Sequence, residues 1–112
     1  MLDTIEEPPI ADKYTTARLS YMDAIVLAQK EEMLRDESVV LIGEDISIYG
    51  GTELVKSFDE NRVRNMPISE NSFTGMGIGA AMTGLRPIVD LTIASFTYLA
   101  SDQIINQASK LR

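Results

Sequence analysis

Residues 39–43 read Val-Val-Leu-Ile-Gly, a short and continuously apolar run that a glycine ends. A run of this length, rich in β-branched residues, is typical of a strand buried on both faces of a parallel sheet. Glu44 and Asp45 follow it directly, at the edge where α/β sheets usually place ligands. Two adjacent acids either bind a divalent cation or lie in a solvated loop, and the residues alone favour the loop. We therefore predict an α/β fold built around this strand.

The sequence before this strand divides into an arm and a helix. Ser20 followed by Asp23 resembles a helix capping box, and apolar residues then recur at helical spacing, so we predict a helix from Tyr21 to Arg35. Residues 1–19 contain two prolines and several acids and are expected to form an extended arm. They have no secretory-type apolar segment, and their early acids are atypical of a mitochondrial transit peptide. We expect residues 20–112 to form the domain and the cytoplasm to be its location.

Beyond the strand, helical and extended patterns alternate. A turn at Gly50 and Gly51 is followed by a short helical stretch over residues 52–58. Because proline cannot donate to a sheet, Pro67 should end the next strand. We predict a strand over 62–66, a helix over 71–84, a strand over 86–93 and a helix over 97–112. This order indicates one domain with a parallel sheet and helical crossovers.

Composition excludes several classes of function. The 112 residues are 45% apolar and 24% charged, as in a globular domain, and they contain no apolar run long enough to cross a bilayer. The net charge of −7 repels nucleic acid and anionic lipid heads, so neither is an expected partner. The chain has no cysteine and no histidine. Its chemistry must therefore come from carboxylates, hydroxyls, lysines or a bound cofactor.

The stretch from Gly75 to Ala80 matches the spacing GxGxxA of dinucleotide-binding loops. That motif requires a tight turn directly after a strand, whereas these glycines lie inside a predicted helix. No acid stands about 20 residues further on, where the motif places one. We interpret Gly75, Gly79 and Gly84 as small residues that thin one helix face so that another backbone can approach.

Glu70 is the most specific candidate for a functional side chain. It follows a predicted strand and immediately precedes a helix of small residues, so it is expected to be at least partly buried. Burial of a carboxyl is costly unless the group is paired, and it makes the group suited to proton exchange. The alternative is an acid favoured by the dipole at a helix N-terminus, and the residues alone leave both readings open.

The sequence from about Tyr21 to Arg112 resembles the β subunit of the thiamine-diphosphate-dependent decarboxylases of 2-oxo acid dehydrogenase complexes, such as pyruvate dehydrogenase. The likeness rests on six blocks in family order: Ile42-Gly43-Glu44-Asp45, Tyr49-Gly50-Gly51, Pro67-Ile68-Ser69-Glu70, Phe73-Thr74-Gly75, Gly79-Ala80-Ala81-Met82-Thr83-Gly84-Leu85-Arg86-Pro87 and Asp102-Gln103-Ile104-Ile105-Asn106. As a set these blocks are highly specific. The resemblance implies the N-terminal part of a transketolase-like pyrimidine-binding domain.

The resemblance also implies a cofactor site. In the family, the glutamate matching Glu70 hydrogen-bonds the aminopyrimidine of thiamine diphosphate and promotes the tautomer that activates the thiazolium carbon. The aromatic residue matching Phe96 stacks on the same ring, and the residue matching Ile68 lines the pocket. A partner α-type subunit holds the diphosphate and its magnesium, so no metal ligand is expected in this chain. Glu44 and Asp45 receive no assigned role.

Subunits of that family are much longer, so a further chain is expected to supply the rest of the β subunit, and this chain alone is expected to be inactive. The expected activity is decarboxylation of a 2-oxo acid with transfer of the acyl or ketol unit to an acceptor, such as a lipoyl-bearing acyltransferase or carrier protein. Two alternatives remain open within the same fold. One is ketol transfer or acetoin cleavage in biosynthesis, and the other is a non-catalytic structural subunit.

Overall fold

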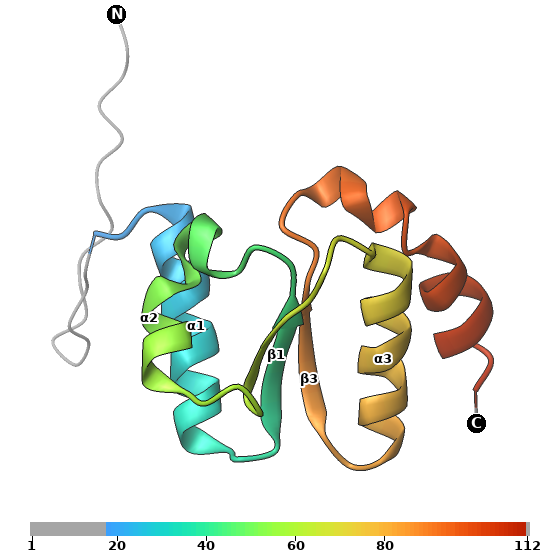
Figure 1. Cartoon of the computed structure of the whole chain (residues 1–112), viewed down its shortest axis with the longest axis horizontal. Helices are drawn as coiled ribbons and strands as arrows, with labels where there is room; N and C mark the ends of the chain where they lie inside the picture. The colour runs from blue at the N-terminus through green and yellow to red at the C-terminus, as the bar shows by residue number, and fades with distance from the viewer. Residues whose placement is uncertain (1–17, 112) are drawn as a thin grey trace, which may run out of the picture.

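A computed structural model describes residues 18–111, so most of the arm predicted for residues 1–19 lies outside the described part of the chain. A three-stranded parallel sheet has helices on both faces, which confirms the predicted α/β fold (Figure 1). Between residues 18 and 111, no helix has the length and apolar character needed to cross a membrane. In chain order the elements are α1 (Tyr21–Arg35), β1 (Val39–Gly43), η1 (Ser47–Gly51), α2 (Thr52–Ser57), β2 (Val63–Asn65), α3 (Glu70–Met82), β3 (Arg86–Asp90), η2 (Ala94–Tyr98) and η3 (Asp102–Ala108).

The predicted apolar strand, β1, lies at the centre of the sheet. The strand order is β2-β1-β3, and Leu41 pairs with Val63 on one side and Ile88 on the other. β1 has a hydrogen-bonded strand on each side and helices over both faces, which explains why every one of its residues is buried. The strands are parallel, so their carboxyl ends meet at one edge, which is the upper edge of the sheet in Figure 1.

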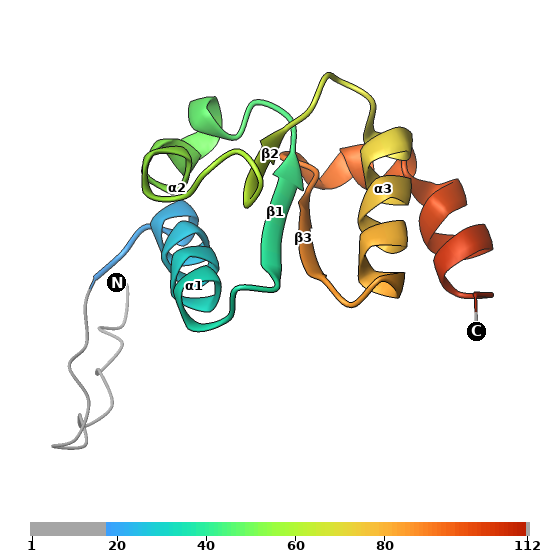
Figure 2. The same cartoon turned by 60° about the horizontal axis from the view of Figure 1, so that its bottom comes forward.

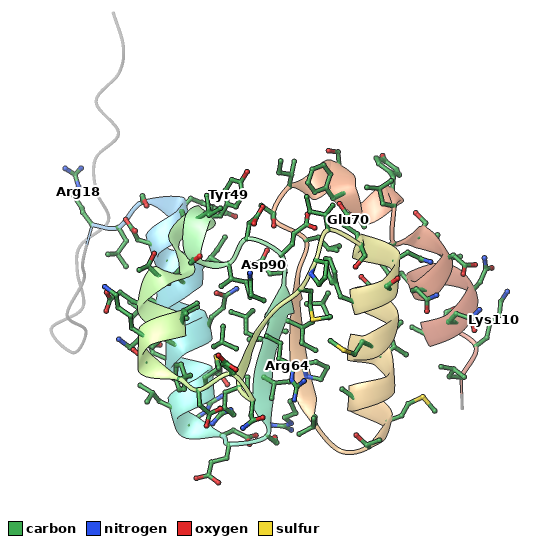
Figure 3. All side chains as sticks on the ribbon, viewed as in Figure 1. Arg18, Tyr49, Arg64, Glu70, Asp90 and Lys110 are labelled. Carbon is green, nitrogen blue, oxygen red and sulfur yellow. The ribbon has the colours of Figure 1, made fainter. Side chains whose placement is uncertain are left out.

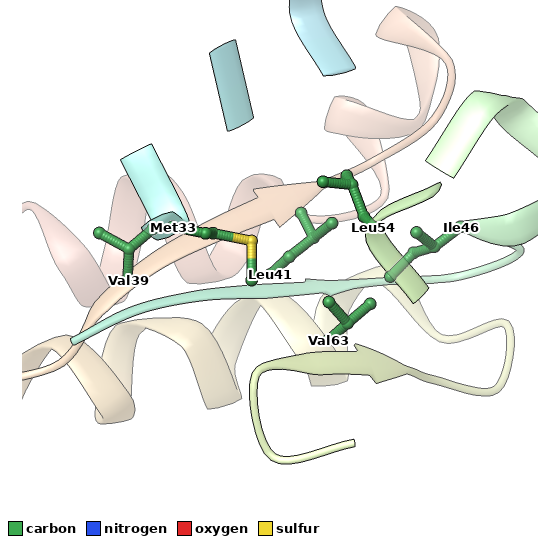
Figure 4. Packing of buried hydrophobic residues seen from close by; sticks show 6 residues of the cluster. All are labelled: Met33, Val39, Leu41, Ile46, Leu54 and Val63. Carbon is green, nitrogen blue, oxygen red and sulfur yellow. The ribbon is translucent and has the colours of Figure 1, made fainter. Parts of the chain in front are cut away.

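Each face of the sheet is covered by its own helices. Figures 1 and 2 show α1 and α2 on one side of the sheet and α3 on the other. Alternate residues of β1 therefore enter two separate apolar clusters, as the period of two in a strand requires. The first cluster, drawn in Figure 4, contains Met33, Val39, Leu41, Ile46, Leu54 and Val63. The second contains Val40, Ile42 and Phe73.

Hydrogen bonds fix both ends of α1. Ser20 accepts a hydrogen bond from the backbone N–H of Asp23 at 3.1 Å, which confirms the predicted N-terminal cap. At the other end, the Arg62 guanidinium donates to the carbonyls of Met33, Asp36 and Val39. Carbonyls in the last turn of a helix lack partners within that helix, so Arg62 satisfies that of Met33, and its bonds to Asp36 and Val39 join α1 to the sheet.

The glycines of α3 lie inside a helix, as predicted, and two of them permit close packing. A Cβ on Gly77 would lie 2.5 Å from a methyl of Val89 in β3, and one on Gly75 would lie 2.8 Å from the Gln103 side chain. Gly79 differs from the expectation, because no described atom would lie within 4 Å of its Cβ. Gly84 also differs from the expectation, because it follows the helix and no described atom would lie within 4 Å of its Cβ; its φ of +99° is a conformation that favours glycine.

The predicted C-terminal helix over 97–112 is wrong in form. The described chain has a short 3₁₀ helix, η2, and then a separate wide-turn π helix, η3, which ends at Ala108. Between them the Ser101 hydroxyl donates to the carbonyls of Thr97 and Tyr98. Hydroxyl groups that bond nearby carbonyls compete with the regular helix pattern, which accounts for the break. Arg112, the predicted last helical residue, lies outside the described residues.

The remaining element bounds differ from the predictions by a few residues. The strand predicted over 62–66 spans Val63–Asn65, and the helix predicted over 71–84 spans Glu70–Met82. The strand predicted over 86–93 ends at Asp90. Asp90 accepts a hydrogen bond from the N–H of Thr92, whose φ of 64° is incompatible with a strand, so the chain turns there.

Candidate functional site

The carboxyl edge of the sheet gathers three loops. The loop after β1 begins with Glu44, the loop after β2 runs from Met66 to Ser69, and the loop after β3 leads into η2. Side chains far apart in the sequence meet here because parallel strands all end on the same side. Figure 1 shows η2 arching over this edge beside the first turn of α3.

Glu70 lies at this edge as the first residue of α3 (Figure 3). Its side chain is buried, with 7% of the residue exposed, so the expectation of burial is confirmed. The preceding residue, Ser69, does not cap the helix with its side chain, because its hydroxyl donates to the carbonyl of Pro67 at 2.9 Å. A carboxylate in the first turn of a helix is favoured by the helix dipole, so this position can hold a buried acid.

Glu44 is a second buried carboxyl, and the sequence analysis missed its burial. It is 5% exposed and continues the face of β1 that carries Val40 and Ile42. Burial raises the pKa of Glu44, and the neighbouring Glu70 carboxyl raises this pKa further, while a hydrogen bond from the Ser69 N–H opposes the rise. Glu44 and Glu70 are therefore two neighbouring buried carboxyls, called the acid pair below.

The other two predicted site residues lie in the flanking loops. Ile68 is 76% exposed, two residues before Glu70, so it presents an apolar side chain at the surface beside the acid. Phe96 is half-buried in η2, where its N–H donates to the Ile93 carbonyl at 2.8 Å. The structure therefore places Glu70, Ile68 and Phe96 on segments that border the same edge of the sheet.

Backbone strain is concentrated at the same edge. Asp45 and Thr92 have φ values of 49° and 64°, and they are the residues other than glycine with positive φ in the described chain. Such a conformation is especially unusual for a β-branched residue like threonine. The Thr92 hydroxyl lies 3.5 Å from the Glu44 carbonyl and joins the loops after β1 and β3. Strained backbone of this kind clusters at functional sites.

The chemistry available at this edge is proton transfer beside apolar and aromatic side chains. Across residues 18–111, the acids do not form a group of three or more that could hold a metal ion. Thr74, one helical turn after Glu70, is also buried, and its hydroxyl has no hydrogen-bond partner. Thr74 could not be predicted as a site residue, because threonine inside a helix has no sequence pattern that reports burial.

Comparison with known proteins identifies the family. A family model described as "Transketolase, pyrimidine binding domain" matches residues 17–112. The 2-oxoisovalerate dehydrogenase subunit beta of Bacillus subtilis (strain 168) is 46% identical over 84% of this chain and 30% of its own length. The pyruvate dehydrogenase E1 component subunit beta of Porphyra purpurea is 48% identical over 86% of this chain and 30% of its own length. That of Rhizobium meliloti (strain 1021) is 40% identical over 96% of this chain and 25% of its own length.

The chain thus spans less than a third of the length of these relatives. The family model nevertheless covers every described residue, including the acid pair at the edge of the sheet. The parallel sheet with helical crossovers agrees with this match. The chain belongs to the transketolase pyrimidine-binding domain family.

Proposed function

We propose that this chain contributes the aminopyrimidine-binding part of a thiamine-diphosphate site in a β-type subunit of a 2-oxo acid dehydrogenase. The observation that carries the proposal is the buried Glu70 carboxyl, paired with Glu44 at the carboxyl edge of a parallel sheet. The family match and the β-subunit names of the relatives support the same class of cofactor and reaction.

The side chains at this edge are of the chemical types that an aminopyrimidine ring requires. Glu70 offers a carboxyl to a ring nitrogen, Phe96 offers a half-buried aromatic face, and Ile68 offers an apolar wall. Aromatic rings stack favourably in offset geometry, and apolar contact excludes water from the polar pair. Thiamine diphosphate, when bound, supplies the carbon nucleophile that attacks a 2-oxo acid.

The contribution of this chain is to hold one proton at Glu70 and to keep water from it. A carboxyl that exchanges a proton with a ring nitrogen must remain hydrogen-bonded through both protonation states. Burial, and then the Glu70 carboxyl beside it, raise the pKa of Glu44, so Glu44 keeps its proton to a higher pH than an exposed glutamate does. Glu70 is therefore the proposed catalytic acid.

The proposed site is completed by other chains. An α-type subunit would hold the diphosphate and its magnesium, and a further stretch of polypeptide would supply the rest of the β subunit. A lipoyl-bearing acyltransferase or carrier protein would accept the product. Support comes from the relatives, which are named as subunits of multi-component dehydrogenases and are about three times as long as this chain.

Cofactor binding by a Phe96→Ala variant tests the proposal. In the β subunit assembled with its partners, loss of stacking and apolar contact should weaken binding of thiamine diphosphate by about 1–3 kcal/mol, measured by calorimetric titration. Phe96→Tyr should bind almost as well as the unmodified protein. Tyr21→Ala is the matched control, because Tyr21 is 89% exposed at the start of α1, a helix that contributes no residue to the three loops of the site. An unchanged dissociation constant for Phe96→Ala would remove Phe96 from the site.

A further inference from the structure

Two buried side-chain atoms among residues 18–111 have no hydrogen-bond partner, and they are Oε2 of Glu44 and the hydroxyl oxygen of Thr74. Both residues are 5% exposed. Buried polar side chains are paired in the large majority of cases, so each unpaired atom requires an explanation. The proposed function uses Glu44 as the neighbour of Glu70, but it gives Thr74 no role.

The register of α3 against β1 places Thr74 near the acid pair. Val40 and Ile42 pack against Phe73, and Glu44 follows them on the same face of the strand. Figure 1 shows that α3 begins at the carboxyl edge of the sheet and runs back beside β3, and its Phe73 also reaches β1. Glu70 is therefore level with Glu44, and Thr74 lies in the next helical turn, level with the end of the strand.

The direction of a helical side chain brings the hydroxyl closer to the pair. Glu70 and Thr74 are four residues apart on the buried face of α3, so their side chains lie one above the other. Every Cα–Cβ bond in a helix tilts toward its N-terminus. The Thr74 side chain therefore leans toward the level occupied by the carboxyls of Glu70 and Glu44.

We propose that Thr74 is a positioning residue of the acid pair, whose hydroxyl supplies the hydrogen bond that Oε2 of Glu44 lacks through one bridging water molecule. A hydroxyl can donate to a carboxylate while accepting elsewhere, and a bridging water serves almost as well as a direct contact. Holding Oε2 of Glu44 orients its carboxyl toward Glu70. The inference rests on the proposed function, because Thr74 acts only through the proton that Glu70 carries.

A second partner for the hydroxyl is the carbonyl of Glu70, four residues earlier in the same helix. Threonine often donates to that carbonyl, and such a bond would make Thr74 purely structural. The two partners give different results when Glu44 is changed. A bond to Glu44 disappears with the Glu44 carboxyl, whereas a bond to the helix backbone does not.

Thermal unfolding of the cofactor-free assembled protein separates these possibilities. Thr74→Val keeps the shape of the side chain and removes the hydroxyl, so it should lower the unfolding midpoint by about 2–8 °C. Thr74→Ser should restore most of that loss. In a Glu44→Met background, where the hydroxyl has lost this partner, Thr74→Val should no longer lower the midpoint and should leave it unchanged or raise it. Thr83→Val is the matched control, because the hydroxyl of Thr83 is exposed and donates only to the Ala80 carbonyl.

Two results would overturn the inference. A higher midpoint for Thr74→Val would mean that the hydroxyl is truly unpaired, since removing an unpaired buried group is stabilising. If Thr74→Val lowered the midpoint equally with Glu44 and with Met at position 44, the hydroxyl would be bonded to the helix backbone. If the Glu44→Met protein failed to assemble, the single variants would still test whether the hydroxyl is paired. A lower midpoint for Thr74→Val, recovered in Thr74→Ser, would show that it is, and a higher midpoint for Thr74→Val would show that it is not.

A turnover measurement adds a readout that a purely structural role would not change. With cofactor bound, Thr74→Val should lower kcat about 10-fold while the cofactor dissociation constant stays within about twofold, and Thr74→Ser should recover kcat. An unchanged kcat for Thr74→Val would contradict the positioning role. If the proposed function itself were wrong, a variant without the Glu70 carboxyl would turn over normally. The unfolding midpoints of Thr74→Val with Glu44 and with Met at position 44 would still show whether Thr74 and Glu44 interact.

Discussion

The apolar layer between α1, α2 and the sheet differs from the carboxyl edge of the same sheet in what it buries. In the layer, Met33, Leu41 and Leu54 are at most 1% exposed, and each of them lies in a regular helix or strand (Figure 4). At the edge, the buried groups are the carboxyls of Glu44 and Glu70, and the flanking loops contain residues with positive φ. Both regions share β1, whose Leu41 is in the layer and whose end leads to Glu44.

This contrast indicates a division between stability and chemistry. Burial of apolar side chains favours folding, whereas burial of carboxyls and strained backbone opposes it. Local rules of folding are usually broken where function requires it. Apolar burial in the layer therefore offsets the unfavourable free energy of the buried carboxyls and strained backbone at the edge. Substitutions in the layer should therefore act on stability, and substitutions at the edge should act on the chemistry or on its pH dependence.

The largest expected effect on stability is that of Leu41→Ala. Leu41 has no exposed surface, so removing its side chain leaves a cavity in the middle of the layer. The free energy of unfolding should fall by about 2–5 kcal/mol, as measured by denaturant titration of the assembled protein. Turnover per folded molecule should remain close to that of the unmodified protein.

Leu34→Ala is the control for this substitution, since Leu34 lies on α1 with 68% of its surface exposed. A loss within about 0.5 kcal/mol is expected there. A loss of turnover in folded Leu41→Ala molecules, at unchanged cofactor affinity, would argue against the division between layer and edge.

A smaller effect with a characteristic pH dependence is expected for Glu44→Gln. The pKa of Glu44 in the fold lies above its ordinary value of 4.5, first because of burial and then because of Glu70. As pH rises past 4.5, the unfolded chain releases this proton more readily, so the folded state of the unmodified protein loses stability until the raised pKa is passed. The unfolding midpoint of Glu44→Gln, relative to the unmodified protein, should therefore rise with pH across that window.

Asp36→Asn supplies a control whose pH dependence has the opposite sign. Asp36 lies at the C-terminal end of α1, outside the carboxyl edge. Hydrogen bonds from the hydroxyl and N–H of Ser38, with help from Arg86, hold the pKa of Asp36 below its ordinary value of 3.8. Its contribution to stability is present above pH 3.8 and is lost as pH falls through the lower, folded pKa. If the unfolding midpoints of Glu44→Gln and Asp36→Asn, each relative to the unmodified protein, changed with pH in the same direction, the pKa of Glu44 would not be raised in the fold.

The sequence allowed most of the layer to be predicted, because its signals are local. The apolar run of β1 and the Ser20 cap of α1 each depend on a few adjacent residues, and both were confirmed. The burial of Glu70 also followed from its position between a strand and a helix of small residues. Local pattern and tertiary structure agree at these positions, as they do in most of a natural fold.

The rest of the edge could not be predicted, because it depends on contacts between distant segments. Glu44 resembled a loop acid in the sequence, and its burial results from α3 lying across the end of β1. At the break between η2 and η3 the Ser101 hydroxyl bonds the carbonyls of Thr97 and Tyr98, and this contact does not alter the helical spacing of the sequence. The roles of Glu70, Ile68 and Phe96 remain predictions that rest on the family.

Turnover and cofactor affinity of Glu70→Gln test the central claim most directly. In the assembled enzyme, the amide has the shape of the carboxyl but cannot exchange its proton, so kcat should fall by a factor on the order of 10² or more. The affinity for thiamine diphosphate and the unfolding midpoint should change little. Glu60→Gln, an exposed acid outside the edge, should turn over normally. Turnover of Glu70→Gln at the unmodified rate, with cofactor bound, would contradict the account.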